Sequence, residues 1–449
     1  MRVFLFQTAK GLSSSSGGYK SNLSLLKYLA HRKHAVAQLC YVWDSDIDSY
    51  YAEMAAAGLE PDFETRVISM PADDSTEVLI RTYTFTTSDG VRNVAFNASD
   101  FMKALPDNVL ARDTARFIEE NQASVQVQVF LHFLDMHIYR FEPTHVIFND
   151  GLMLKATSII PSLRDVSRNL IVHTAEQLPF GPFAGGIPGA SYSTGEHKLM
   201  RGVDAIWAVS ECIRNYAQKH GQIESTFHIH HPWTYLDSKT HALPTRRENW
   251  DKTAIGFVNP CPVKGSSIFR DLAKRCPEFK FVALSSWGIN PQVEAELREV
   301  PNIDLRQTAS DMEKVWSEIK LLLVPSLWLE AWGIVVVEAQ LRGIPVISSD
   351  AGAIPEAKLG IPVIIPVNSL TGERSAEGGY AIPEQDIEPW KEAVTKLMTD
   401  KDWYEEIAER ARTETASWLA EIDHNALESW LLKSTKPATM HSNMKISIV

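Results

Sequence analysis

The sequence predicts an α/β protein made of two domains, each built on a parallel sheet. Short apolar runs, typical of buried parallel strands, alternate along the chain with helical segments. The chain has 449 residues, a length that suggests two or three domains. A polar segment at 237–249 separates two series of such elements and is interpreted as a linker. We therefore expect Rossmann-like domains at 1–240 and 250–415.

The first series opens with a strand, a Gly/Ser-rich turn and a helix. RVFLF at 2–6 predicts the strand, and GLSSSSGGYK at 11–20 forms the turn before a helix over about 21–33. Further strands are expected at 35–39, 144–149, 170–174 and 204–210, and a further helix at about 211–220.

The second series repeats the alternation of strand and helix and ends in helices. Strands are expected at 253–258, 279–284, 321–324 and 345–349, with a buried helix at 334–341. An amphipathic region from 390 to about 433 predicts helices, and the tail at 434–449 is expected to be disordered.

Composition excludes several classes of function. Lys and Arg number 44 and Asp and Glu 56, so the net charge is −12, which argues against a general nucleic-acid binder. The four cysteines are scattered and form no CxxC, so neither a disulfide framework nor a zinc site is expected. The chain shows no secretory signal and no apolar run of membrane-spanning length. We expect a cytoplasmic protein whose membrane contact is at most peripheral.

The most informative segment, at 325–356, places two glutamates around a strand-to-helix turn. Its sequence is PSLWLEAWGIVVVEAQLRGIPVISSDAGAIPE. Gly333 allows the backbone to approach a ligand closely, and the following helix begins where free N–H groups attract an anion. Glu330 precedes that point, and Glu338 lies about one turn into the helix. A phosphate between two hydroxylated sugars fits this arrangement, because carboxylates accept hydrogen bonds from sugar hydroxyls.

This segment resembles the signature of family 4 retaining glycosyltransferases, which have the GT-B fold of two Rossmann-like domains facing an interdomain cleft. The resemblance covers the second domain strongly and the first weakly. It implies transfer of a sugar from a nucleotide-diphosphate sugar, with a UDP-sugar favoured, to an acceptor hydroxyl, without metal or other cofactor. It also implies that the last helix, at 416–433, packs back onto the first domain. The matching residues are Pro325, Ser326, Glu330, Ala331, Trp332, Gly333, Glu338, Gly343, Pro345, Val346, Gly352, Pro355 and Glu356.

The resemblance also implies roles in donor binding. Glu338 is expected to hold the ribose hydroxyls, and Glu330 a hydroxyl of the transferred sugar. Backbone N–H groups around the turn are expected to stabilise the departing diphosphate. These groups belong to Trp332, Gly333, Ile334 and Val335.

Lys264 follows the first strand of the second domain, on the turn VNPCPVKG at 258–265. A lysine there can neutralise a diphosphate leaving group, and it resembles the family's Lys-Gly element. The alternative is an exposed turn lysine. The family often has Gly-Arg upstream, where this chain has Asn259 and Pro260, so a second phosphate-binding cation is left open. Asn259 is nevertheless expected to be one of the donor-binding residues.

Two features of the first domain point to a ligand at strand ends. Gly17 and Gly18 resemble the family's N-terminal glycine loop, whose backbone approaches the donor phosphate or the acceptor. His173 ends a strand, and open α/β sheets bind ligands at that edge. In the family a histidine there lies near the donor sugar, so we interpret it as catalytic. The loop at 178–188, rich in Pro, Gly and Phe, lines an acceptor site or only packs the domain.

The sequence contains two possible metal motifs and is compatible with two other functions. Asp44-Ser-Asp46 has the DxD spacing of metal-binding GT-A enzymes, but we expect a solvated loop. His228, His230 and His231 lack a nearby Cys or carboxylate partner, so no metal site is predicted. The alternatives to a glycosyltransferase are a GT-B nucleotide-sugar 2-epimerase, which needs no acceptor, and a catalytically silent sugar-nucleotide-binding protein. The acceptor is not identified by the sequence.

Overall fold

The structure is a computed structural model, and its chain divides into two compact units. It describes residues 1–10, 17–56, 58, 63–71, 77–103, 110–185, 192–232, 242–286, 288–307, 311–376, 378–423 and 425–436. Unit 1 contains Met1–Ala208, Tyr216–His230 and His424–Val449, and unit 2 contains Val209–Asn215 and His231–Asp423.

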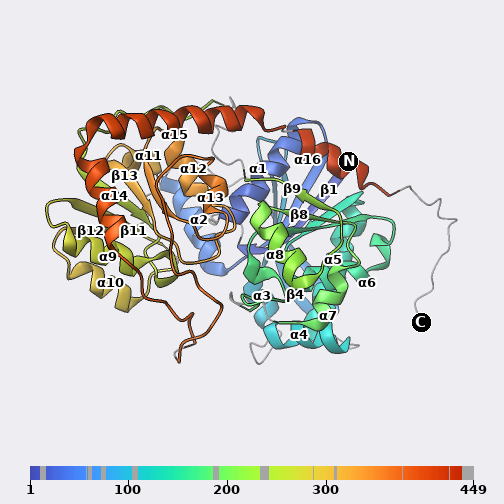
Figure 1. The fold of residues 1–449 in the computed structure, drawn as a ribbon. Helices are drawn as coiled ribbons and strands as arrows, with labels where there is room; N and C mark the ends of the chain where they lie inside the picture. Colours follow the sequence, from blue (N-terminus) through green and yellow to red (C-terminus); the bar gives the residue numbers. More distant parts are fainter. Residues whose placement is uncertain are drawn as a thin grey trace. The chain divides into compact units, whose positions relative to one another are not determined.

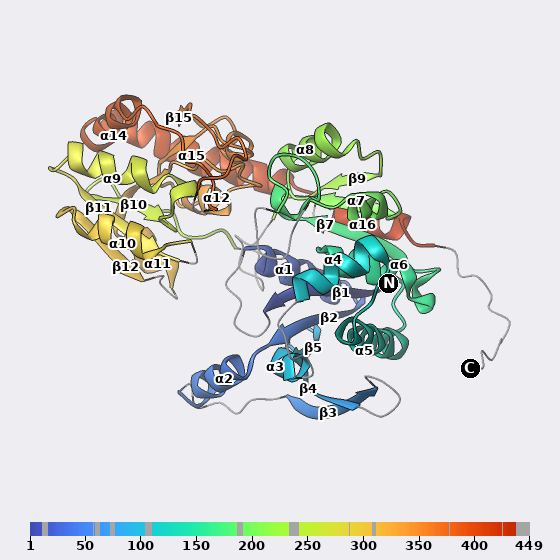
Figure 2. The ribbon, with the colours of Figure 1, turned by 90° about the horizontal axis from the view of Figure 1, so that it is seen from below.

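Unit 1 is built on one sheet, which in its described part has nine strands in the order β3-β4-β5-β2-β1-β6-β7-β8-β9 (Figures 1 and 2). From β5 to β9 neighbouring strands are parallel. The expected strands correspond to β1, β2, β6, β7 and β8, whereas β5 and β9 were not predicted. The strands are β1 (Arg2–Lys10), β2 (Ala35–Val42), β3 (Glu64–Pro71), β4 (Glu77–Thr86), β5 (Arg92–Asn97), β6 (His145–Phe148), β7 (Ser167–Val172), β8 (Ala205–Ala208) and β9 (Phe227–Ile229).

The antiparallel extension of this sheet was not predicted. β3 pairs with β4, and β4 with β5, in antiparallel register. Buried and exposed side chains alternate at the start of β4, as is typical of an antiparallel strand with one solvated face. Such strands lack the continuous apolar runs that marked the parallel strands.

Helices flank the sheet of unit 1, and two of them differ from the sequence prediction. α1 starts at Gly17, so Gly17 and Gly18 form its first turn, because its buried face already begins at Tyr19. The expected loop at Asp44–Asp48 is the first turn of α2, where acidic side chains favour a helix N-terminus. The helices are α1 (Gly17–His31), α2 (Asp44–Ala56), α3 (Ala98–Lys103), α4 (Leu110–Glu120), α5 (Val125–Phe141), α6 (Gly151–Ile159), η1 (Pro161–Leu163), η2 (Ala175–Gln177), α7 (Thr194–Met200), α8 (Glu211–Gly221), whose first residues belong to unit 2, and α16 (Asn425–Lys433).

In its described part, unit 2 is built on a six-stranded sheet in the order β12-β11-β10-β13-β14-β15, with parallel neighbours throughout. Its strands are β10 (Ala254–Val258), β11 (Lys280–Ser285), β12 (Ile303–Gln307), β13 (Ile319–Val324), β14 (Val346–Ser349) and β15 (Ile364–Ile365). Its helices are η3 (Pro262–Lys264), α9 (Ser266–Arg275), α10 (Pro291–Arg298), α11 (Met312–Trp316), α12 (Ile334–Gln340), α13 (Ile354–Ala357), α14 (Glu388–Thr399) and α15 (Lys401–Glu421).

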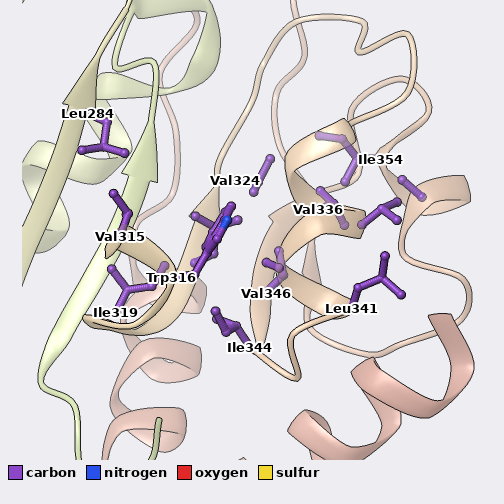
Figure 3. Packing of buried hydrophobic residues seen from close by; sticks show 14 of the residues in the cluster. Leu284, Val315, Trp316, Ile319, Val324, Val336, Leu341, Ile344, Val346 and Ile354 are labelled. Carbon is purple, nitrogen blue, oxygen red and sulfur yellow. The ribbon is translucent and has the colours of Figure 1, made fainter. Parts of the chain in front are cut away.

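The core of unit 2 fixes the strand-to-helix segment that carries the sequence signature. Every residue of β13 is buried, and Trp316 packs among side chains of β13 and β14 such as Val324 and Val346 (Figure 3). Val336 on α12 belongs to the same cluster and is fully buried. Burial of each such side chain stabilises the fold by roughly 1.5–3 kcal/mol. The position of α12, and with it the end of the preceding loop, is therefore fixed by the core.

The last described helix, α16, packs within unit 1. The expected helical region at 416–433 is divided, because α15 ends at Glu421 and α16 begins at Asn425. Leu427 and Leu431 of α16 join a core cluster with side chains of α1 and β1. Glu428 forms an ion pair with Arg32 at 2.9 Å, and its carboxylate lies within hydrogen-bond distance of His34 Nε2, at 2.6 Å. Of the tail expected at 434–449, residues 437–449 lie outside the described part.

No helix among the described residues is long and apolar enough to cross a membrane.

Candidate active site

The strand order of unit 2 reverses between β10 and β13, its two central strands. β10 is followed outward by β11 on one side, and β13 by β14 on the other. In open α/β sheets, ligands bind beyond the carboxyl ends of the strands at such a reversal. The segments that leave these two strands are η3 and the loop at 325–333. They carry Lys264 and Glu330, the two predicted catalytic residues of this domain.

Backbone contacts hold these two segments together. The carbonyl oxygen of Val263 accepts hydrogen bonds from the N–H groups of Leu327 and Trp328, at 2.9 and 3.0 Å. Gly265 has φ +82°, and a Cβ there would lie 2.0 Å from the carbonyl oxygen of Pro325. Only glycine therefore permits this turn, which fixes the position of the adjacent Lys264.

Lys264 and Glu330 form an ion pair through Nζ and Oε1. Their side chains are 21% and 15% exposed, so the pair is accessible at the end of the sheet. The Lys264 ammonium also lies 5.1 Å from the ring centroid of Trp328. The ammonium can neutralise a phosphate, and the carboxylate can accept hydrogen bonds from hydroxyl groups.

Gly352 fixes the backbone on which Glu330 sits. It has φ +62°, and a Cβ there would lie 2.2 Å from the backbone nitrogen of Glu330. The neighbouring N–H of Ala353 donates to the Glu330 carbonyl oxygen at 2.7 Å. This contact gives a physical reason for the glycine of the Gly-x-x-Pro-Glu turn.

The other residues predicted to bind the sugar-nucleotide donor lie at the end of the loop and on the first turns of α12. Gly333 is the N-cap of α12, with φ 106°, and its carbonyl accepts from the N–H of Val336 at 3.0 Å. Ile334 and Val335 form the first turn and are half-buried. Glu338 lies in the next turn, also half-buried, and its backbone carbonyl accepts from the Arg342 guanidinium at 2.7 Å.

The Trp332 side chain is used for packing. It is only 3% exposed and stacks on the ring of His231, with centroids 4.0 Å apart and 17° between the planes. His231 Nδ1 donates to the carbonyl oxygen of Val209 at 3.0 Å, and its Nε2 lies 3.5 Å from the Glu356 carboxylate. Burial lowers the pKa of His231 and raises that of Glu356. Sequence reasoning missed this pairing, whose only signal was the glutamate of the Gly-x-x-Pro-Glu turn.

The histidine cluster at 228–231 divides among different aromatic partners. His228 stacks on Trp430 at 5.0 Å, and His230 packs against Trp207 at 5.4 Å. Among the residues that the structure describes, no group of three or more His, Cys, Asp or Glu side chains is arranged to hold a metal ion.

Asn259 shapes the loop after β10. Its φ is +61°, and its side chain is largely buried. The side-chain oxygen of Asn259 accepts a hydrogen bond from the N–H of Gly288 at 3.1 Å. The backbone N–H of Asn259 donates to the carbonyl oxygen of Leu284 at 2.9 Å. The amide at this position is therefore committed to loop structure.

In unit 1, His173 directly follows β7 and packs against the first turn of α1. A Cβ on Gly18 would lie 3.3 Å from two ring carbons of His173, so this glycine allows the ring its close approach. The ring Nε2 is 3.0 Å from Asn22 Oδ1, and the backbone N–H of His173 donates to Gln177 at 2.7 Å. Burial lowers the pKa of His173 to about 4, so the ring is neutral at physiological pH.

The described part of the loop at 178–188 favours packing over acceptor lining. Leu178, Phe180 and Phe183 are 1%, 3% and 5% exposed. The N–H of Phe183 donates to the Tyr216 hydroxyl at 3.0 Å. Residues 186–188 lie outside the described part.

Comparison with known proteins gives one family match and one curated relative. Residues 294–414 match the family model described as glycosyl transferases group 1. An exopolysaccharide phosphotransferase from Streptomyces coelicolor is 24% identical over 157 residues. That match covers 33% of this chain and only 15% of the relative.

Solved structures of similar fold cover nearly the whole chain. Sucrose-phosphate synthase from Thermosynechococcus elongatus has a TM-score of 0.61 and 12% identity, covering 96% of this chain and 97% of that one. A mutant of S. aureus TarM in complex with Fondaparinux, alpha-GlcNAc-glycerol and UDP has a TM-score of 0.60 and 11% identity, covering 97% and 100%. Anabaena HepE in complex with UDP-glucose has a TM-score of 0.57 and 12% identity, covering 95% and 99%. The predicted GT-B fold, with two parallel-sheet domains, is confirmed.

Proposed function

We propose that this chain is a group 1 glycosyltransferase of the retaining type, which transfers a sugar from a UDP-sugar to an acceptor hydroxyl. The observation that carries the proposal is the Lys264–Glu330 pair beyond the strand reversal of unit 2. A cation that neutralises a diphosphate and a carboxylate that holds sugar hydroxyls stand there side by side. The family match at 294–414 includes the loop and α12 and supports the same class.

Each group has a role in the proposed reaction. The Lys264 ammonium and the N–H groups of Gly333, Ile334 and Val335 stabilise the negative charge that develops on the departing diphosphate. Glu330 accepts a hydrogen bond from a hydroxyl of the transferred sugar, and Glu338 from the ribose hydroxyls.

The bond changes are those of a same-face substitution. The bond between the anomeric carbon and the diphosphate oxygen breaks, and its electron pair leaves with UDP. The acceptor oxygen bonds to the anomeric carbon from the face that UDP leaves, and its proton passes to the diphosphate oxygen. We propose no metal requirement, because Lys264 supplies the positive charge that the leaving group needs.

In unit 1, we propose that neutral His173 accepts a hydrogen bond from a sugar hydroxyl. It lies beyond the carboxyl end of β7, where ligands bind in open α/β sheets. Gly18 allows the ring to approach α1, and its own contribution is this close packing.

The choice of UDP draws on the solved neighbours. HepE was solved with UDP-glucose, and the TarM mutant with UDP. These are properties of those proteins, and they favour uridine among the donors to be tested first.

The direct test incubates the protein with a panel of UDP-, GDP- and ADP-sugars, with and without EDTA. Calorimetry measures binding, and phosphorus NMR identifies the nucleotide released. Sugar transfer releases UDP, whereas transfer of a sugar phosphate, the activity suggested by the name of the curated relative, releases UMP. Proton NMR of the product reports whether the anomeric configuration is retained.

Three outcomes would replace the proposal. UMP release identifies a sugar-phosphate transferase. UDP with a free sugar isomer, formed without any acceptor, identifies a 2-epimerase. Binding without turnover over a broad acceptor panel identifies a silent sugar-nucleotide-binding protein. Absence of binding to every nucleotide diphosphate contradicts the donor site itself.

A further inference from the structure

A continuous chain of buried amide side chains runs from His173 across the centre of unit 1. Asn22 on α1 donates through Nδ2 to Gln7 Oε1 on β1, at 3.0 Å. Gln7 donates through Nε2 to Gln38 Oε1 on β2, at 2.8 Å. Gln38 donates to Asn93 Oδ1 on β5. All four amide residues are at most 3% exposed.

The direction of this chain is set at its far end by a backbone carbonyl. Asn93 Nδ2 donates to the carbonyl oxygen of Val91 at 3.0 Å. A carbonyl oxygen only accepts, so Asn93 must present its nitrogen there and its oxygen to Gln38. Each amide then has to donate toward Asn93 and accept from the His173 side.

The same pattern of donors and acceptors determines which nitrogen of the His173 ring carries the proton. Asn22 uses its nitrogen on Gln7, so its oxygen faces His173 Nε2 at 3.0 Å. An oxygen acceptor requires that Nε2 carries the proton. The neutral ring then has its lone pair on Nδ1, for which the described residues provide no hydrogen-bond partner.

We propose that this amide chain fixes the Nε2-protonated tautomer of His173 and so presents Nδ1 as an acceptor for a sugar hydroxyl. Asn22, Gln7, Gln38 and Asn93 are thus positioning residues that act through the histidine. The identity of the ligand rests on the proposed function, whereas the tautomer does not. The opposite tautomer would place an N–H donor at Nδ1 and would set the Nε2 lone pair against the Asn22 oxygen.

The surroundings keep this arrangement neutral. Tyr19, whose hydroxyl accepts from Gln38 at 3.4 Å, is a titratable side chain beside the amide chain, and Cys40 on β2 interacts with Tyr19 electrostatically. Burial raises the pKa of each to about 12. Neither side chain is charged at physiological pH. Burial alone accounts for the low pKa of His173.

The test measures the tautomer directly, by ¹⁵N NMR of histidine-labelled protein without substrate. The His173 ring signals are assigned by their loss in His173→Gln. We expect one protonated Nε2 and one unprotonated Nδ1, unchanged from pH 6 to 9. In Asn22→Leu the acceptor is lost, and we expect a mixture of tautomers. Asn169→Leu is the matched control, because Asn169 is a buried amide on β7 that lies outside the chain.

Kinetics give a second readout. Asn22→Leu should lower kcat by about tenfold, the scale of one neutral hydrogen bond, while UDP affinity stays unchanged. The double variant with His173→Gln should lose no more than His173→Gln alone, because both changes remove the same contact. Asn169→Leu should instead combine additively with His173→Gln.

The proposal is overturned if wild-type His173 carries its proton on Nδ1, or if Asn22→Leu leaves the Nε2–H tautomer intact. It is also overturned if the Asn22 and His173 changes are additive in kcat. A confirmed tautomer in a protein that uses no sugar nucleotide would leave the amide chain standing and reject the proposed function instead.

Discussion

Lys264 and Glu330 are paired with each other across the ends of β10 and β13. A diphosphate that binds Lys264 must therefore compete with the Glu330 carboxylate for the same ammonium. In the absence of ligand, the glutamate holds the lysine in place and leaves neither charge unpaired. In the proposed reaction, the lysine turns to the phosphate when a donor binds, and Glu330 accepts a sugar hydroxyl. Substitution of either residue thus changes the state of the other.

Lys264→Ala should lower turnover by about two to three orders of magnitude, the scale for removal of one electrostatic group that stabilises a transition state. The measurement is kcat with a saturating UDP-sugar. Lys274→Ala on α9, an exposed lysine in the same unit, is the control and should behave like wild type. Equal turnover in Lys264→Ala and Lys274→Ala would show that Lys264 is an ordinary turn residue.

Glu330→Ala and Glu338→Ala should separate turnover from nucleotide binding. Loss of Glu330 frees the Lys264 ammonium from its competitor, so UDP should bind at least as tightly as to wild type, while kcat falls. Loss of Glu338 removes the proposed ribose contact, so UDP binding should weaken by roughly ten- to a hundredfold, the scale of one hydrogen bond to a charged group.

Calorimetry with UDP alone compares the two glutamate variants directly. If Glu330→Ala weakens UDP as much as Glu338→Ala does, the assignment of the two carboxylates along the donor is wrong. If both bind UDP like wild type, Glu338 does not contact the ribose.

Gly352→Ala should lower turnover by more than the strain of its positive φ alone would cause. Gly352 and Gly360 both have positive φ, +62° and +76°, so alanine costs about 1 kcal/mol of conformational strain at either position. At Gly360 nothing lies within 4 Å of the added Cβ, whereas at Gly352 the Cβ would meet the Glu330 backbone at 2.2 Å. We expect Gly360→Ala to retain its turnover and Gly352→Ala to lose at least tenfold.

Chemical denaturation of the two glycine variants separates backbone strain, which lowers stability in both, from displacement of Glu330, which only Gly352→Ala should cause. Similar losses of unfolding free energy and of turnover in both variants would mean that Gly352 does not position Glu330. A specific loss of turnover in Gly352→Ala supports the contact.

The sequence predicted the parts of this fold that have continuous patterns. Apolar runs marked β10, β13 and α12, and Gly333 and Gly343 marked the two ends of α12. The bounds of these elements in the structure agree with the predicted ones to within a few residues. The antiparallel strands β3 and β4 were missed, because their half-exposed residues form no apolar run. Short-range motifs also singled out Lys264 and Glu330 as candidate site residues. Their direct pairing depends on how β10 and β13 lie side by side, which no local pattern contains.

The amide chain behind His173 shows the same limit. Gln7, Asn22, Gln38 and Asn93 are spread over four elements, and each is unremarkable in its own segment. Only the sheet order, which places β5, β2 and β1 next to each other, brings their side chains into line. Long-range polar networks of this kind have no periodicity that a single sequence displays.

A half-buried carboxyl group in unit 1, that of Glu196, predicts how stability depends on pH. A Cβ on Gly151 would lie 2.7 Å from the Glu196 carboxylate, so this group sits against the start of α6. Burial, with the charges of Asp150 and Glu119, raises the pKa of Glu196 to about 8 from its ordinary value of 4.5. Between these two values the folded state holds a proton that the unfolded state has released. The free energy of unfolding therefore falls as pH rises from 4.5 to 8, by at most about 1.4 kcal/mol per pH unit from this group.

Glu196→Gln should remove this loss, because glutamine is neutral at every pH. We expect the variant to unfold at a higher temperature than wild type at pH 8.5 and at nearly the same temperature at pH 5. Glu119→Gln changes a neighbouring carboxylate whose own pH dependence has the opposite sign, and it also removes one of the charges that raise the pKa of Glu196. The Ser193 hydroxyl and the Gly195 N–H lower the pKa of Glu119, so its stabilisation is present above the ordinary pKa and is lost as pH falls through the lowered one. That variant should therefore be less stable than wild type at pH 8.5. Thermal unfolding followed by circular dichroism from pH 5 to 9 measures both, and a Glu196→Gln curve parallel to that of wild type would show that Glu196 is ionised in the folded protein.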